Sequence, residues 1–252
     1  MSRVRLNSVV SGPVGAPVVV LGPSLGTDLT LWEPQLDALH EHFQVLRFDL
    51  RGHGGSAAPP GPYTLDDLGG DVLGLLDERG LGAVRYAGVS LGAMIGLWLA
   101  AHAPHRVYRL AACCTSASVG PPEPWLERAA RVRTDGPAAI AGAMVDRWFT
   151  PGFRDRSPAT VDRFTRMLCA QPAEGYAGCC AAVGTMDLRP VLGRIRVPTL
   201  VLAGADDPAT PPVHGAAVAA AVGGELVTVP GAHLANVESP AEVGAPLVAH
   251  FT

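Results

Sequence analysis

Short apolar runs alternate along the chain with stretches whose apolar residues recur at helical spacing. Six runs bounded by turn residues are typical of buried strands: 17–21, 43–48, 83–87, 107–113, 198–203 and 226–229. Most of the intervening stretches predict helices, at 29–39, 65–76, 91–101 and 213–221. Strands and helices in this alternation form right-handed crossovers, so we expect an α/β protein with a mostly parallel sheet and helices on both faces.

The two ends of this pattern carry further information. Residues 3–10 alternate between apolar and polar, which predicts one strand of an antiparallel opening hairpin. Between about residues 116 and 196 only helical spacing is found, at 125–133, 137–149, 158–169 and 174–183. The strand pattern resumes at Pro198 and needs the earlier strands as neighbours. We therefore expect a single domain over 1–252, with a core of 1–115 and 197–252 and a helical lid at about 116–196.

Composition narrows the class of protein. The 252 residues are 48% hydrophobic and 17% charged, which is typical of a globular protein. No apolar run reaches the roughly 18 residues of a membrane helix, and the first ten residues do not resemble a secretory signal. The five cysteines include two adjacent pairs, which rarely form disulfides, and no metal-ligand spacing is present. We expect a cytoplasmic protein that binds no membrane, metal or cofactor.

The charge distribution is uneven. All 19 basic residues are arginines, and the net charge is −4. Residues 116–196 contain 11 Arg against 8 acidic residues, so this segment is positive within a negative chain. A positive segment favours an anionic ligand. No basic run with interleaved aromatic residues is present, so nucleic-acid binding is not expected.

A candidate nucleophile lies between a predicted strand and a predicted helix. The sequence Gly-Val-Ser-Leu-Gly at 88–92 directly follows the apolar run 83–87 and directly precedes a helical stretch. A G-x-S-x-G turn needs glycines because the serine lies in a tight, strained bend between strand and helix. This context predicts that Ser90 is the nucleophile of a serine hydrolase.

A serine hydroxyl needs a base within hydrogen-bond reach and a third group to orient that base. His233 is the one late histidine in a loop that follows a predicted strand, as the Ser, acid, His order of such hydrolases requires. The acid is expected after the strand at 198–203, where Asp206 and Asp207 are adjacent. Asp207 is favoured because the turn directs the later carboxylate back across the strand ends, and Pro208 rigidifies the loop. Asp206 is the alternative acid, and otherwise a cap for the helix after Pro211.

Two backbone amides are predicted to stabilise the oxyanion that develops during acyl transfer. The amide of Leu91, the residue after the nucleophile, supplies the first donor. The second is expected in the loop after the strand at 17–21, where Pro23 has no N–H group. Leu25 is therefore the predicted second donor.

Together these motifs resemble the 3-oxoadipate enol-lactonase family of the α/β-hydrolase fold. The resemblance extends over nearly the whole chain, and its most discriminating parts lie in the predicted lid. The matching strings are 24–29 with Trp32, 49–54, 88–92, Ala-Thr-Pro-Pro at 209–212, Arg-Trp-Phe-Thr at 147–150, 174–182 and Met-Asp-Leu-Arg at 186–189.

The resemblance implies cofactor-free hydrolysis of a small anionic lactone, 3-oxoadipate enol-lactone, to 3-oxoadipate. A lid arginine would then hold the substrate carboxylate. The sequence does not rank the candidates, and two lid tryptophans are further candidates for the pocket wall. These substrate-binding candidates are Arg131, Arg133, Arg147, Arg189, Trp125 and Trp148.

Two other functions fit the same scaffold, because one fold hosts many chemistries. The first is an esterase or lactonase of secondary metabolism that accepts a bulkier substrate, which a panel of aryl esters would reveal. The second is a ligand-binding protein without turnover, which a Ser90 unreactive toward fluorophosphonate would indicate. The sequence does not specify an oligomeric state.

Overall fold

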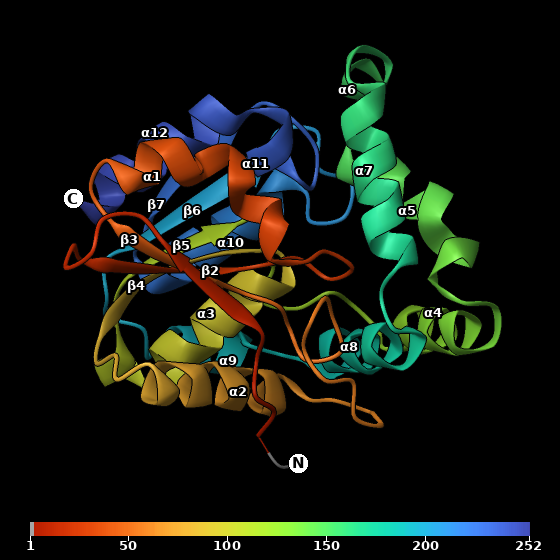
Figure 1. The fold of residues 1–252 in the computed structure, drawn as a ribbon, viewed down its shortest axis with the longest axis horizontal. Coiled ribbons are helices and arrows are strands. Elements are labelled where there is room, and N and C mark those ends of the chain that lie inside the picture. Colours follow the sequence, from red (N-terminus) through yellow and green to blue (C-terminus); the bar gives the residue numbers. More distant parts are fainter. Residues whose placement is uncertain (1–2) are drawn as a thin grey trace.

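Seven strands lie side by side in the order β1-β3-β2-β4-β5-β6-β7. This is the arrangement in the computed structural model, which describes residues 3–252 (Figure 1). All neighbouring strands are parallel except β1 and β3. The strands are β1 (Ser8–Ser11), β2 (Val18–Gly22), β3 (Gln44–Phe48), β4 (Val84–Val89), β5 (Val107–Cys113), β6 (Thr199–Gly204) and β7 (Glu225–Val229). The predicted fold class is confirmed, and each of the six buried strands lies within two residues of its predicted range.

The N-terminal hairpin prediction is wrong in its pairing. Strand β1 is antiparallel, as expected, but it pairs with β3, and Ser8 lies opposite Phe48. The strand also begins late, because the preceding residues bond to other groups. The Val4 amide donates to Asp71 at 2.7 Å, and the Asn7 amide donates to the Ser56 hydroxyl at 2.8 Å.

Helices cover both faces of the sheet (Figure 1). On one face are α1 (Leu36–His40), α11 (Ala235–Glu238) and α12 (Pro240–Phe251), with α1 against β3 and α12 against β5 and β6. On the other are α2 (Leu65–Glu78), α3 (Leu91–His102), α9 (Arg189–Leu192) and α10 (Pro212–Val222). Two short 3-10 helices, η1 (Leu29–Gln35) and η2 (Pro104–Arg106), lie in the connections before α1 and β5. Among residues 3–252, no helix combines the length and apolar character needed to cross a bilayer.

Every element between β5 and β6 is helical. Residues 116–196, named the helical segment below, contain α4 (Glu123–Asp135), η3 (Pro137–Ile140), α5 (Ala141–Trp148), α6 (Pro151–Arg156), α7 (Pro158–Cys169) and α8 (Ala173–Thr185), followed by α9. The α6 turn was not predicted, and η3 interrupts the expected helix over 137–149. Helix α4 packs along α8, and α4 to α8 stand together at one end of the sheet (Figure 1).

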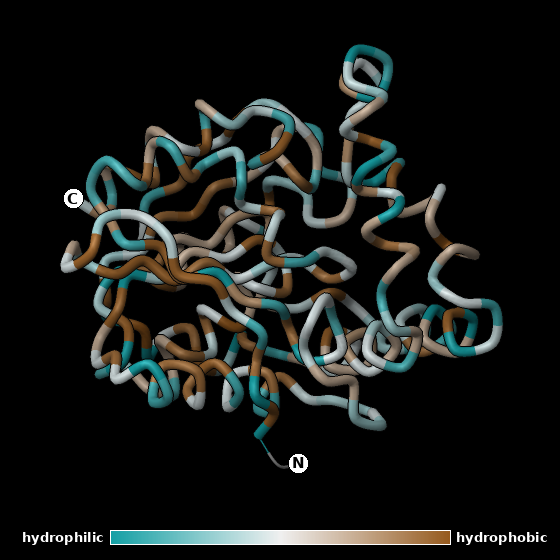
Figure 2. Tube along the Cα trace, in the orientation of Figure 1, coloured by the Kyte–Doolittle hydropathy of each residue, from teal (hydrophilic) through white to brown (hydrophobic). Residues whose placement is uncertain are grey.

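The main hydrophobic core lies between the sheet and its covering helices. In Figure 2 the hydrophobic colour follows the central strands, while hydrophilic stretches lie on the outer turns. Strand β6 is buried along its whole length, as expected for a parallel strand covered on both faces. Rigid strands therefore support the loops that follow their carboxyl ends, where Ser90 and His233 lie.

Candidate active site

Ser90 occupies a strained turn between β4 and α3. Its backbone has φ 55° and ψ −116°, in the positive-φ region that side chains rarely adopt. A Cβ atom added to Gly88 would lie 2.2 Å from the carbonyl carbon of Gly92, and one added to Gly92 would lie 2.4 Å from the oxygen of Gly22. Both positions therefore require glycine, because strand, turn and helix approach too closely for any side chain. The turn directs Ser90 away from β4 and toward the loops of the neighbouring strands.

Three side chains from distant parts of the chain form a hydrogen-bonded line. The Nε2 atom of His233 lies 2.8 Å from the Ser90 hydroxyl oxygen, and its Nδ1 atom lies 2.8 Å from Oδ2 of Asp207. All three side chains are buried, with exposed fractions of 8% or less. This is the geometry that lets an imidazole take a proton from a serine while a carboxylate orients the ring.

The Asp207 carboxylate is fully engaged by its own loop. Its Oδ1 atom accepts from the amides of Ala209 and Thr210, and its Oδ2 atom accepts from the Thr210 hydroxyl at 2.7 Å. Burial raises the pKa of Asp207, but the charge of His233 and the hydrogen bonds from His233 and Thr210 outweigh it, so the pKa lies below its ordinary value. Asp206 is exposed and does not cap α10, whose N-cap is Pro211 without a side-chain hydrogen bond.

The loop after β2 contributes backbone amides to the site around Ser90. Among residues 3–252, no protein group accepts a hydrogen bond from the Leu25 amide or from that of Leu91, the first residue of α3. The neighbouring Gly26 amide donates to Nε2 of buried His53 at 3.0 Å, and His53 Nδ1 donates to the Arg51 carbonyl at 3.3 Å. Burial lowers the pKa of His53 to about 4, so the ring remains a neutral acceptor that anchors the loop.

The helical segment is bonded directly to the loop that carries His233. The amides of His233 and Leu234 donate to the carbonyls of Arg147 and Trp148, at 3.3 and 3.0 Å. Buried Glu238 adds a second connection, since its Oε2 atom accepts from the amides of Ala232 and Thr150 at 3.0 and 3.2 Å. The end of α5 therefore helps to fix the imidazole.

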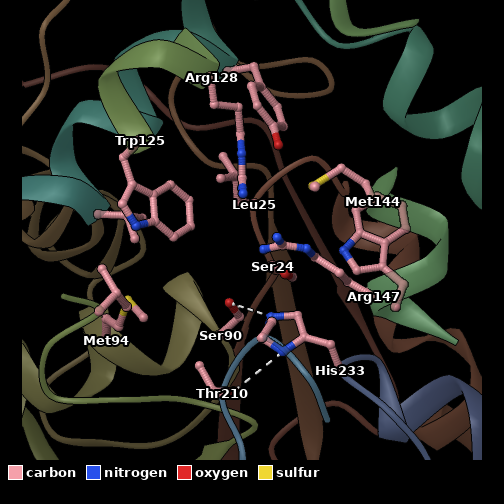
Figure 3. A pocket seen from close by; sticks show the side chains of 15 residues that line it. Ser24, Leu25, Ser90, Met94, Trp125, Arg128, Met144, Arg147, Thr210 and His233 are labelled. Atoms are coloured by element: carbon pink, nitrogen blue, oxygen red, sulfur yellow. Dashed lines mark hydrogen bonds between the residues drawn. The ribbon is translucent and has the colours of Figure 1, made fainter. Parts of the chain in front are cut away.

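A cavity lies above Ser90, between the sheet loops and the helical segment (Figure 3). It offers about 60 Å³ for the centres of water molecules, which is room for a few waters or a small organic molecule. Both polar and apolar side chains line it: Ser24, Leu25, Ser90, Met94, Val119, Trp125, Arg128, Met144, Arg147, Trp148, Tyr176, Val183, Ala209, Thr210 and His233. Such a lining suits a small, partly apolar ligand with a few polar groups.

Of the six candidates for substrate binding, Trp125, Arg147 and Trp148 line the cavity. The other three lie outside it. Arg133 pairs with Glu174 at 2.7 Å, and Arg189 pairs with its neighbour Asp187 at 2.8 Å. Arg131 is exposed on α4.

Sequence analysis missed Arg128, the second arginine of the cavity. It lies one helical turn after Trp125 on α4, with its guanidinium carbon 4.4 Å from the indole ring centre. Tyr176 of α8 also lines the cavity, and burial raises the pKa of its phenol, so it stays protonated at neutral pH. The spacing of Trp125 and Arg128 was the available signal, because residues three apart share a helix face.

Within residues 3–252, no group of three or more His, Cys, Asp or Glu side chains is arranged to hold a metal ion. The five cysteines are all unpaired thiols. The polar groups that converge on the cavity can supply a nucleophile, a base, hydrogen-bond donors and positive charge.

Comparison with known proteins gives close matches over almost the whole chain. Residues 17–140 match the alpha/beta hydrolase fold family. The 3-oxoadipate enol-lactonase 2 of Acinetobacter baylyi is 40% identical over 94% of this chain and 89% of its own length. The crystal structure of the enol-lactonase from Burkholderia xenovorans LB400 is 40% identical, covers 98% of this chain and 96% of its own, and superposes with a TM-score of 0.96. A malate-bound thermophilic esterase from Thermogutta terrifontis is 28% identical, with coverage of 99% and 95% and a TM-score of 0.92.

Proposed function

The chain belongs to the 3-oxoadipate enol-lactonase family of α/β hydrolases, and we propose that it opens the lactone ring of 3-oxoadipate enol-lactone to give 3-oxoadipate. The relatives from Acinetobacter baylyi and Burkholderia xenovorans are enol-lactonases. The observation that carries the assignment of roles is the line from Asp207 through His233 to Ser90, with both contacts at 2.8 Å. Such a line supports Ser90 as the nucleophile, His233 as the base and Asp207 as the orienting acid.

In the first half of the reaction, the Ser90 oxygen attacks the lactone carbonyl carbon while its proton passes to Nε2 of His233. The bond from that carbon to the ring oxygen then breaks, and His233 returns the proton to the departing oxygen. The product of this step is an enol whose acyl end is esterified to Ser90. Because the enol becomes a ketone, it departs more easily than an ordinary alkoxide.

In the second half, His233 takes a proton from water while the water oxygen attacks the acyl carbon. The Ser90 oxygen departs with that proton, and the free carboxylic acid ionises. Both halves pass through a tetrahedral oxyanion, for which the unpartnered Leu25 and Leu91 amides are the proposed donors. Loss of one such donor costs about 3 kcal/mol in other hydrolases.

The lining of the cavity favours a small anionic substrate. Arg128 and Arg147 supply positive charge, while Met94, Trp148 and Val183 supply an apolar wall. The cavity is small, so we expect the six-carbon enol-lactone to be preferred over a bulkier aryl ester. The helical segment is the proposed lid, because it supplies both arginines and closes the space above Ser90.

The test is turnover of the enol-lactone, followed by its ultraviolet absorbance, in wild type and Ser90→Ala. We expect kcat to fall by about 10,000-fold or more, since the three residues act as a unit. Ser157→Ala is the matched control, because Ser157 lies on the helical segment and makes no capping hydrogen bond with its side chain. Full activity in Ser90→Ala would remove the proposed nucleophile, and a wild type that cleaves only larger esters would remove the proposed substrate.

A further inference from the structure

Two guanidinium groups reach into the cavity from different walls. Arg128 extends from α4 and Arg147 from α5, and Figure 3 shows both side chains directed toward the space above Ser90. Two positive charges in one partly enclosed space repel each other, and a ligand with negative charge relieves that repulsion. The pair therefore needs an explanation in terms of what the cavity binds.

Neither arginine is neutralised by the protein. Among residues 3–252, no carboxylate lies within ion-pair distance of Arg128 or Arg147. Other arginines of the helical segment do have carboxylate partners, such as Arg133 with Glu174 and Arg163 with Glu33. The two cavity arginines thus keep their full capacity to bind a carboxylate.

The two arginines differ in what fixes them. Arg128 stacks on Trp125 of the same helix, so its guanidinium is held against an indole ring of α4. Arg147 lies on α5, whose end is hydrogen-bonded to the loop of His233, and Figure 3 shows its guanidinium beside Ser24, above Ser90 and His233. One guanidinium is therefore positioned by an indole ring of the lid, and the other lies on the helix that contacts the His233 loop.

The charge of the ligand changes during the reaction. A lactone with one carboxylate consumes one water and leaves as a dicarboxylate with release of one proton, and the new carboxylate forms at the Ser90 end of the chain. The substrate therefore needs one cationic partner far from Ser90, and the product needs a second one close to it.

We propose that Arg128 binds the carboxylate that the substrate brings, and that Arg147 binds the carboxylate that hydrolysis generates. The cavity is then a two-point dicarboxylate site that recognises the product more fully than the substrate. This assignment rests on the proposed function for its account of turnover, but the binding of dicarboxylates is measurable without turnover.

The first experiment measures binding of adipate and hexanoate to wild type by calorimetry. The two probes have the same six-carbon chain, and only adipate has a carboxylate at each end. A charge-assisted hydrogen bond from arginine predicts that adipate binds about 10- to 100-fold more tightly than hexanoate. Equal affinities would overturn the two-point site, whether or not the enol-lactone is hydrolysed.

The second experiment separates the two arginines. In Arg128→Met, we expect KM for the enol-lactone to rise about 10-fold or more with little change in kcat, and Arg128→Lys recovers part of this loss. In Arg147→Met, we expect KM to change little, while competitive inhibition by adipate weakens about 10-fold or more. Arg131→Met is the matched control, since Arg131 lies on the same helix as Arg128 but outside the cavity.

Equal effects of the two arginine variants would contradict the division of roles. If both cavity variants change KM and inhibition to the same extent, or neither differs from Arg131→Met, the assignment is wrong. A wild type that binds adipate far better than hexanoate but does not open the enol-lactone would refute the proposed function and leave the dicarboxylate site standing. If Arg128→Met does not fold, the KM of Arg128→Lys and the binding of adipate against hexanoate to wild type still test the proposal.

Discussion

The two walls of the cavity hold their polar groups in different ways. On the sheet side, Ser90, His233 and Asp207 are buried and hydrogen-bonded to one another, and the Asp207 carboxylate accepts four hydrogen bonds in all. On the helical side, Arg147 is exposed and has no carboxylate partner among residues 3–252. The polar groups on the sheet side are hydrogen-bonded before any ligand binds. On the helical side, the ligand supplies the partner for the arginine charge.

This difference indicates that the sheet side acts in the reaction, while the helical side recognises the ligand. Groups that act on developing charge are most effective when their orientation is fixed in advance, because no reorganisation is then needed during the reaction. Groups that recognise a substrate gain by leaving charge unpaired, since the correct ligand then supplies the missing partner. Substitutions on the sheet side should therefore act on kcat, and those on the helical side mainly on KM and inhibition.

Among the substitutions that test this comparison, Asp207→Asn is expected to have the largest effect on kcat. The substitution keeps the size of the side chain but places an amide against His233 and favours the wrong ring tautomer. In a serine protease the same change lowers kcat by about 10,000-fold, and we expect a similar fall here. Asp206→Asn is the matched control, because Asp206 is adjacent and exposed. Steady-state kinetics on the enol-lactone measure kcat of both variants. A large fall in Asp206→Asn with little change in Asp207→Asn would assign the acid to Asp206.

A second prediction concerns His53, a buried neutral ring that anchors the loop after β2 through the Gly26 amide. Its folded-state pKa of about 4 lies below the ordinary value of 6.5, so the unfolded chain binds the proton first as pH falls. Stability from this group is therefore present above pH 6.5 and is lost between about pH 6.5 and 4, by about 3 kcal/mol in total.

The measurement for His53 is urea unfolding of wild type and His53→Gln at pH 7.5 and 4.5. A glutamine keeps an acceptor for the Gly26 amide but does not titrate in this range, so the variant should lose less stability on acidification than wild type. His102→Gln is the control, because His102 is exposed on α3. The same acid loss in wild type and His53→Gln would contradict the account.

A third prediction tests the connection between the two walls through Glu238. Alanine at this position leaves the Ala232 and Thr150 amides without their acceptor, which costs about 1 to 3 kcal/mol for a buried group. Because Ala232 precedes His233, we expect kcat to fall about 10-fold or more. Glu238→Gln should restore most of it, since one amide oxygen replaces the accepting carboxylate oxygen.

Kinetics of these variants beside Glu242→Ala, an exposed position on α12, would measure this effect. If Glu238→Ala loses thermal stability but keeps wild-type kcat, Glu238 is only a structural link and does not position His233.

The smallest effects are expected for the arginines that point away from the cavity. Arg133 and Arg189 form exposed ion pairs, and such pairs contribute little to stability because water screens them. Alanine at either position, or at Arg131, should change kcat/KM by less than about twofold. A large loss of kcat/KM in any of the three would mean that the helical segment adopts another arrangement when substrate binds.

Much of the sheet side could be predicted from sequence, because local rules fix it. Buried parallel strands give continuous apolar runs, and the loops that carry Ser90, Asp207 and His233 directly follow such runs. The pairing of β1 with β3 was beyond those rules, because alternation shows that a strand has two different faces but not which strand lies beside it.

The helical side was less predictable, because the orientation of a lid helix depends on what it packs against. Only Ala129 and Val132 of α4 are buried, so the apolar pattern of that helix is too weak to show which arginine faces inward. Contact with α8 turns Arg128 into the cavity and leaves Arg131 outside. Glu238 was missed for a related reason, since one of its partners, Thr150, lies in a distant segment.

The central claim is that Ser90 is a nucleophile activated by His233, and labelling with a fluorophosphonate tests it most directly. Trypsin cuts this lysine-free chain only at arginines, so Ser90 is the one serine of the peptide 86–106. We predict a single adduct, on that peptide, in wild type and none in Ser90→Ala or His233→Ala. An unlabelled 86–106 peptide from protein that hydrolyses the enol-lactone would contradict the claim.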